Sequence, residues 1–320
     1  MDVDPAEWRR HQRYLLAVAY RLLGSLTEAE DAVQEAYLRL AGAEATDVGD
    51  LRAWLSTVVS RICLDQLRSA RARRESYVGP WLPEPLVGDA LAPDPPESDP
   101  AERVTLAESV HMAVLIVLET LSPAERVAFV LHDVFGLSFA QIGRVVGRTP
   151  GACRQLASRA RRDVRARAPQ VDVDAGELER IVSAFHAAAR TGDIDTLIGL
   201  LDPDVVLRSD GGGQAPAALR PVHGADQVAR LVAGLTARRD TGLTVATVRV
   251  NAAPGFLLKQ GNTVVGVGVV STAGGRITAI DLVVNPDKLR HVDPATDTSR
   301  PRWTMPPASL TGRYGSVPQP

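Results

Sequence analysis

A proline-rich stretch in the first third of the chain limits what the whole sequence can fold into. Its seven prolines occupy positions 80, 83, 85, 93, 95, 96 and 100. Proline removes a backbone donor and clashes with the preceding helical turn, so no helix can run through most of this stretch. We expect a semi-stiff, extended linker over 76–104, with separate folding units on each side.

Residues 1–75, before this linker, predict an all-helical domain. Apolar residues recur at helical spacing from Leu15 to Leu26. The sequence TEAE (Thr27 to Glu30) predicts a capping box that starts a second helix. The apolar face expected for that helix is Val33, Ala36, Tyr37 and Leu40. A third helix is expected from Asp50; it contains Trp54 at a core spacing and ends in a run of arginines.

Residues 105–170, after the linker, predict a helix-turn-helix. SPAE (Ser122 to Glu125) and SFAQ (Ser138 to Gln141) are capping-box patterns. GRTPGA then breaks the chain, and Thr149 can cap a final helix that has Pro150 at its first position. Helix, short glycine-containing turn and helix are typical of this motif.

The final helix of this unit has the composition of a recognition helix. Gly151 and Ala152 are small enough to let the backbone approach a major groove, and longer polar residues follow that can read base edges. The expected DNA-contacting residues are Thr149, Gly151, Arg154, Gln155, Ser158, Arg159 and Arg162. The alternative is an arginine-rich solvated face.

A second basic patch, RICLDQLRSARARRE, closes the first helical unit. Two basic surfaces separated by a linker indicate two DNA contacts at a distance from each other. The alternative is a solvated helix end favoured by the helix dipole.

Residues 174–294 change in character and predict an α+β domain. Helices are expected at 175–190, 195–201 and 225–238, followed by four β-branched runs separated by Gly and Asn, which indicate an antiparallel sheet. We expect the tail at 295–320 to be disordered. The fold class is therefore multidomain, with two all-α domains followed by an α+β domain.

The composition argues against a metalloprotein, a disulfide-rich secreted protein and a membrane protein. The net charge of −2 argues against a uniformly basic coat, and Cys63 and Cys153 lie too far apart to suggest a metal site or a disulfide framework. The acidic N-terminus lacks a signal-peptide pattern, and no apolar run is long enough to span a membrane. We expect a soluble cytoplasmic protein without metal, cofactor or membrane contact.

The first half of the chain resembles the extracytoplasmic-function sigma factors of bacterial RNA polymerase. Three motifs occur in the family's order: EDAVQEAYLRL, LRAWLSTVVSRICLDQLRSARARR and LSPAERVAFVLHDVFGLSFAQIGRVVGRTPGACRQLASRARRDV. The resemblance implies binding to the clamp and flap regions of core RNA polymerase and to the −10 and −35 elements of promoter DNA.

The resemblance also implies roles for particular residues. Core polymerase would be bound by Asp31, Gln34, Glu35 and Leu38, and the −10 element by Arg61, Asp65 and Arg68. The family's specificity loop would lie at about 44–50, which is acidic and lacks aromatics. We expect Trp54 to be buried rather than to stack on a base.

The second half resembles a SnoaL-type, NTF2-like cone. SDGGGQ, NPDKL and YVGPWLPEPL together resemble the sigma factors that carry this extension, although Gln214 stands where lysine is usual. We expect 209–214 to pack near the linker at 77–86, with Trp81 docking on the loop Asp210 to Gln214, and the cone to regulate the sigma factor in cis. The alternative is a plain linker whose Trp81 merely covers a nearby helix. The expected interdomain residues are Trp81, Pro83, Asp210, Gly211, Gly212, Gly213, Asn285, Asp287 and Lys288.

Two other functions stay open at this point. A one-component helix-turn-helix regulator with a ligand-binding cone would bind duplex DNA without polymerase. An isomerase or hydrolase would use Asp281 and His186 inside the cone, but no tyrosine lies between Val173 and Val292 to serve as an oxyanion donor. We therefore expect no catalytic residues, and we leave open a small ligand in the cone.

Overall fold

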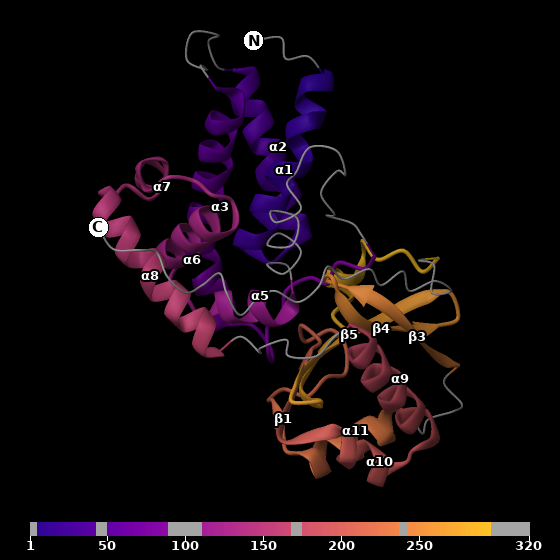
Figure 1. Ribbon diagram of the computed structural model, residues 1–320. Coiled ribbons are helices and arrows are strands. Elements are labelled where there is room, and N and C mark those ends of the chain that lie inside the picture. Colours follow the sequence, from indigo (N-terminus) through magenta and orange to yellow (C-terminus); the bar gives the residue numbers. More distant parts are fainter. Residues whose placement is uncertain (1–4, 43–49, 89–110, 168–174, 237–241, 296–320) are drawn as a thin grey trace.

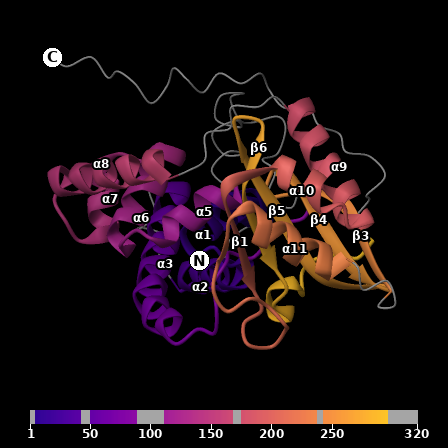
Figure 2. The same ribbon diagram turned by 90° about the horizontal axis from the view of Figure 1, so that it is seen from below.

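The computed structural model describes residues 5–42, 50–88, 111–167, 175–236 and 242–295. Two groups of helices lie beside each other, and a sheet with three further helices lies next to them (Figures 1 and 2). We call these parts the first helical domain, the second helical domain and the cone. The expected tail, the second half of the linker and nearly all of the expected specificity loop lie outside the described residues. No helix within the described ranges is long and apolar enough to cross a membrane.

The first helical domain consists of α1 (Pro5–Leu23), α2 (Leu26–Ala41) and α3 (Leu51–Glu75). The cap of α2 is Ser25, whose Oγ accepts the Glu28 N–H, so the predicted start at Thr27 was wrong. Ser25 has the extended backbone of an N-cap, and Thr27 already lies in the first turn. Tyr37, predicted on the apolar face, is instead exposed and contacts the ring of Trp8.

The second helical domain contains the predicted helix-turn-helix. Its elements are α5 (Met112–Glu119), α6 (Pro123–Phe129), a π-helical turn (Val130–Val134), α7 (Phe139–Val146) and α8 (Pro150–Arg167). Both predicted capping boxes form, at Ser122 and Ser138, and the Thr149 Oγ1 accepts the Ala152 N–H. The buried side chains of both helical domains form one apolar cluster, in which α3 packs against α6 and α7.

The cone has a mixed sheet rather than the purely antiparallel one predicted. Its elements are α9 (Ala175–Thr191), α10 (Ile194–Leu200), β1 (Leu201–Asp210), β2 (Val222–His223), α11 (Ala225–Thr236), β3 (Leu243–Val250), β4 (Ala253–Gln260), β5 (Thr263–Ala273), β6 (Arg276–Val283) and a 3₁₀ turn (Pro286–Leu289). The strand order is β2-β1-β6-β5-β4-β3, and β1 runs parallel to β6. The long connection through α11 and the β3–β5 meander permits that parallel pairing.

Both faces of the sheet are buried. Helices α9, α10 and α11 cover one face, where Phe185 packs against Phe256. The other face packs against Leu82 of the linker and Met112 of α5. Double burial explains why β5, TVVGVGVVSTA, does not alternate between apolar and polar residues. The cone is therefore packed against the linker and the second helical domain.

Gly24, at the corner between α1 and α2, offers a test of this packing. Its φ is +70°, and an added Cβ would lie 3.1 Å from the Trp81 ring, 3.2 Å from Glu119 Oε1 and 3.4 Å from an Arg126 nitrogen. Gly147 has a similar φ of +72° but open space around it. We expect Gly147→Ala to lower the free energy of unfolding by the backbone strain alone, about 1–2 kcal/mol. Gly24→Ala should lower it further, which urea denaturation would show as a larger drop in the midpoint. Equal drops would show that Trp81 does not press on this corner.

Candidate functional site

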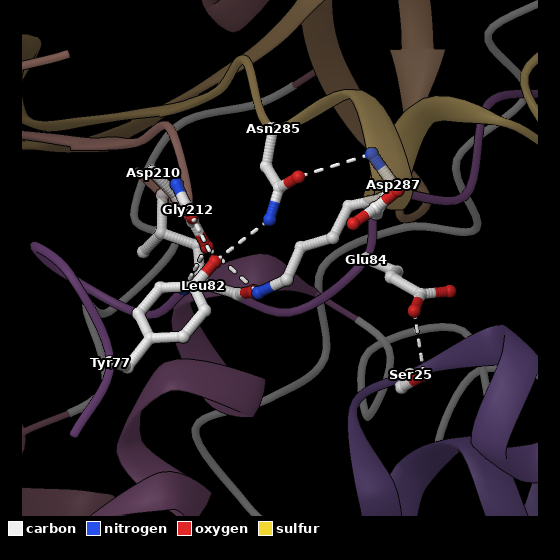
Figure 3. A network of polar contacts seen from close by, with 9 residues as sticks. Ser25, Tyr77, Leu82, Glu84, Asp210, Gly212, Asn285 and Asp287 are labelled. Carbon is white, nitrogen blue, oxygen red and sulfur yellow. Dashed lines mark hydrogen bonds and ion pairs between the residues drawn. The ribbon is translucent and has the colours of Figure 1, made fainter. Parts of the chain in front are cut away.

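The linker meets the cone at Asp210, the last residue of β1. Its carboxylate is fully buried and receives four hydrogen bonds (Figure 3). Oδ1 accepts from the Tyr77 hydroxyl at 2.6 Å and the Gly212 N–H at 3.1 Å. Oδ2 accepts from the Leu82 N–H at 2.8 Å and from Lys288 Nζ at 2.7 Å. A buried charge with this many donors is held in one position.

Lys288 connects Asp210 to the aromatic residues of the linker. Its buried Nζ also donates to the Leu82 carbonyl at 2.5 Å. The same Nζ lies 4.0 Å from the Trp81 ring centroid and 5.2 Å from that of Tyr77. Such cation–π contacts reach about 2 kcal/mol when the cation is desolvated. On its other side, Trp81 reaches the Gly24 corner, so it bridges the cone and the first helical domain.

Asn285 completes the network from the end of β6. Its Nδ2 donates to the Tyr77 hydroxyl at 2.9 Å, and its Oδ1 accepts the Asp287 N–H at 3.0 Å. Burial, and then the hydrogen bond to Asp210, raise the pKa of Tyr77, so the phenol stays neutral and donates to Asp210. A Cβ on Gly212 would lie 2.3 Å from Asn285 Nδ2, which explains why glycine occupies this position.

The expected packing of 209–214 against the linker is present, but through different side chains. Tyr77 contacts Asp210, and Val78 lies against Gly213, whose added Cβ would be 3.3 Å away. Trp81, expected to dock on this loop, has the ammonium of Lys288 over its ring. Pro83 is buried in the linker.

A tight turn at one end of the loop and a hydrogen bond at the other hold its shape. An added Cβ on Gly211 would lie 2.4 Å from the Ala215 carbonyl oxygen, so the tight turn requires glycine. Gln214 Nε2 donates to Asp287 Oδ2 at 2.6 Å, which provides a neutral donor where the resembling proteins usually have lysine.

Glu84 was missed by the sequence analysis. Its buried carboxylate accepts from the Ser25 hydroxyl at 2.6 Å and from the N–H groups of Leu26 and Thr27 at 2.8 and 3.2 Å. Figure 3 shows Glu84 beside Ser25. An acid between two prolines resembles a solvated spacer, and no local pattern distinguishes it.

The residues expected to bind polymerase share one exposed face of α2. They are Asp31, Gln34, Glu35 and Leu38. Leu38 is 63% exposed, and Glu35 pairs with Arg39 at 2.5 Å. The face therefore presents two acids, an amide and an apolar side chain to solvent.

The residues expected to contact the −10 element lie on α3. Asp65 and Arg68 form an exposed pair at 3.1 Å, and Arg61 donates to the Arg144 carbonyl of α7 at 2.8 and 3.3 Å. Trp54 is partly buried against the helical core, as expected. The contact between Arg61 and α7 therefore joins the two helical domains at the edge of this surface.

The residues expected to contact the −35 element are exposed on or before α8. They are Thr149, Gly151, Arg154, Gln155, Ser158, Arg159 and Arg162. The guanidinium of Arg154 lies 5.3 Å from the Phe139 ring centroid. Arg161, on the other side of α8, pairs with Asp133 at 2.6 Å and fixes α8 to the π-helical turn.

Asp281 and His186, the two candidate catalytic residues of the cone, are packed against other side chains of the cone. Asp281 is buried and forms a bidentate pair with Arg208, at 2.6 and 3.2 Å. Burial raises the pKa of Asp281, while Arg208 opposes that shift. Burial lowers the pKa of His186, which lies 5.9 Å from the Phe256 ring. Within the described part of the chain, no group of three or more His, Cys, Asp or Glu residues could hold a metal ion.

Comparisons with known proteins agree with this arrangement. Residues 8–73 match the family described as Sigma-70 region 2, and residues 111–164 match Sigma-70, region 4. The ECF RNA polymerase sigma factor SigJ of Mycobacterium tuberculosis is 41% identical over 89% of this chain and 93% of its own. The probable ECF RNA polymerase sigma factor SigI of the same species is 39% identical over 90% and 95%. The crystal structure of M. tuberculosis SigJ, an extracytoplasmic function sigma factor, aligns with a TM-score of 0.70 and 38% identity, covering 89% of this chain and 98% of that one.

Trp81→Ala should loosen the domains, because it removes the side chain between Lys288 and the Gly24 corner. Limited digestion with thermolysin, which cleaves before aliphatic residues, should then cut faster within 77–88. Trp81→Phe keeps an aromatic face for Lys288 and should change the rate less. An unchanged cleavage pattern in the alanine variant would count against the bridging role.

Asp210→Asn should leave Lys288 without its charged partner in a buried position. Breaking such a pair costs about 3–5 kcal/mol, measurable as a lower urea midpoint. Asp287→Asn removes the charge from an exposed pair with Arg290 and leaves an amide oxygen that can still accept from Gln214, so it should cost less than about 1 kcal/mol. Similar midpoints for the two variants would contradict the central role given to Asp210.

Proposed function

The chain belongs to the extracytoplasmic-function RNA polymerase sigma factors, and on that premise we propose how its parts divide the work. Members of this family direct promoter-specific transcription initiation, and sigma regions 2 and 4 bind core RNA polymerase and promoter DNA. We assign core and −10 binding to residues 1–75, −35 binding to 105–170, and regulation to 174–294. The residues 76–104 link the first two. Binding to core RNA polymerase implies that the protein is located in the cytoplasm.

In this proposal the exposed face of α2 binds the polymerase clamp. A coiled-coil partner requires acids, amides and an apolar contact, which Asp31, Gln34, Glu35 and Leu38 supply. The single observation that carries the assignment is that all four side chains lie exposed on one face of α2.

The arginines of α8 would read the −35 element, with Gln155 and Ser158 between them. Arg61, Asp65 and Arg68 would contact the −10 region. Because Arg61 donates to the Arg144 carbonyl of α7, full access to the −10 face requires that this contact between the helical domains open.

The cone would modulate initiation in cis by holding the linker. The supporting observation is that one face of its sheet packs on both Leu82 of the linker and Met112 of α5, while Asp210 binds the linker backbone. A small ligand in the cone remains a hypothesis. Sigma factors are not enzymes, and the pairing of Asp281 with Arg208 supports a structural role for that carboxylate.

Charge reversal on α2 tests the polymerase surface. We expect the double variant Asp31→Lys, Glu35→Lys to lower run-off transcription with core polymerase of the source bacterium on genomic promoter fragments by at least about tenfold, because like charges then face the clamp. Asp204→Lys, an exposed reversal on the cone, should have little effect. A one-component DNA-binding regulator would be insensitive to both changes, and no specific initiation by the unmodified protein would contradict the sigma assignment.

A further inference from the structure

The first turn of α2 is capped by a residue from outside the helix. Initial N–H groups of a helix have no intrahelical acceptors. The Glu28 N–H donates to Ser25 Oγ at 3.1 Å, whereas those of Leu26 and Thr27 donate to Glu84. The Ser25 hydroxyl itself donates to Glu84. A carboxylate at this end also interacts favourably with the helix dipole.

Glu84 is held for this task by its own backbone. Its N–H donates to the Gly24 carbonyl at 2.8 Å, and its carbonyl accepts the Tyr20 hydroxyl at 2.6 Å. Pro83 fixes its own φ, and Pro85 restricts the backbone of Glu84 to extended conformations. Little backbone freedom is therefore lost when the carboxylate binds α2.

The cone touches the same segment through Asn251, in the turn between β3 and β4. Asn251 Nδ2 donates to the Tyr20 hydroxyl at 2.8 Å. Its backbone N–H donates to the Leu86 carbonyl at 2.8 Å, and its Oδ1 accepts the Leu86 N–H at 3.0 Å. A continuous path of hydrogen bonds thus runs from the cone through the linker to the start of α2.

We propose that Glu84 positions the polymerase-binding face of α2, so that docking of the cone and linker orders that face. The inference rests on the proposed function of α2 and identifies the residue through which the cone reaches it. The face begins at Asp31, about one turn beyond the residues that Glu84 caps. When the linker leaves α2, two N–H groups of the first turn lose the oxygen that accepts them, and the helix start loses a nearby negative charge. The docked cone therefore favours polymerase binding.

The test uses full-length Glu84→Ala and Glu84→Gln at a temperature where circular dichroism shows both to be folded. Titration with core polymerase should show affinity weakened by roughly 3- to 30-fold for Glu84→Ala, the effect of losing a helix cap. Glu84→Gln keeps an acceptor but no charge and should lose less. Hydrogen exchange should accelerate at the amides of 26–28 and stay unchanged in α8.

His291→Ala is the matched control. His291 Nε2 lies 2.7 Å from the Pro85 carbonyl, so this change weakens linker docking on the cone side without touching α2. We expect a smaller loss of affinity than for Glu84→Ala. An equal loss would show that docking alone matters and would overturn the positioning role.

Combination with the α2 charge reversal separates this inference from the proposed function. If Glu84 acts through that face, its loss should cost less affinity in the Asp31→Lys, Glu35→Lys background than alone. Fully additive losses would mean that Glu84 acts only through general stability and would overturn the inference. If Glu84→Ala binds polymerase with unchanged affinity, only the inference about Glu84 is overturned. If the charge-reversed protein binds with unchanged affinity, the proposed function of α2 is contradicted, and the inference about Glu84 fails with it.

Discussion

The buried carboxylate of Asp210 fixes how the cone of this sigma factor is joined to the linker. Removing a carboxylate and an ammonium from water is costly, and only good geometry with additional hydrogen bonds offsets that cost. Here the offset comes from a phenol, two backbone N–H groups and Lys288, and two of these donors belong to the linker. Separating the cone from the linker therefore removes two of the four hydrogen-bond donors from the Asp210 carboxylate.

The linker has a structural role because its side chains alternate between two cores. Leu82 packs in the apolar cluster of the cone, and Leu86 packs in the cluster shared by the helical domains. Between them, Glu84 turns toward α2. The prolines that made this stretch look like a spacer hold these three side chains in an extended segment with little freedom left to lose. A short peptide thus acts as the common interface of three folded parts.

Local patterns predicted the elements, whereas long-range pairing was harder to predict. The capping boxes at Ser122 and Ser138, the helix-turn-helix and the four strands β3 to β6 follow from residues close in sequence. No β-branched run predicted β1 or β2. The resemblance to known sigma factors also indicated that Asp210, Asn285 and Lys288 meet the linker. Glu84 and Asn251 escaped prediction because their partners lie 58 and 231 residues away. The parallel pairing of β1 with β6 is likewise set by topology rather than by strand composition.

The sequence separation of the Tyr77 contacts has a consequence for synthesis. Tyr77 leaves the ribosome well before Asn285, which lies 208 residues later. At about 5–20 residues per second, the wait is roughly 10–40 s. The second helical domain ends at Arg167, about 120 residues before Asn285, so both helical domains are made roughly 6–24 s before Asn285 and Lys288. A newly made molecule therefore passes through an interval in which its two helical domains exist but its cone is still incomplete.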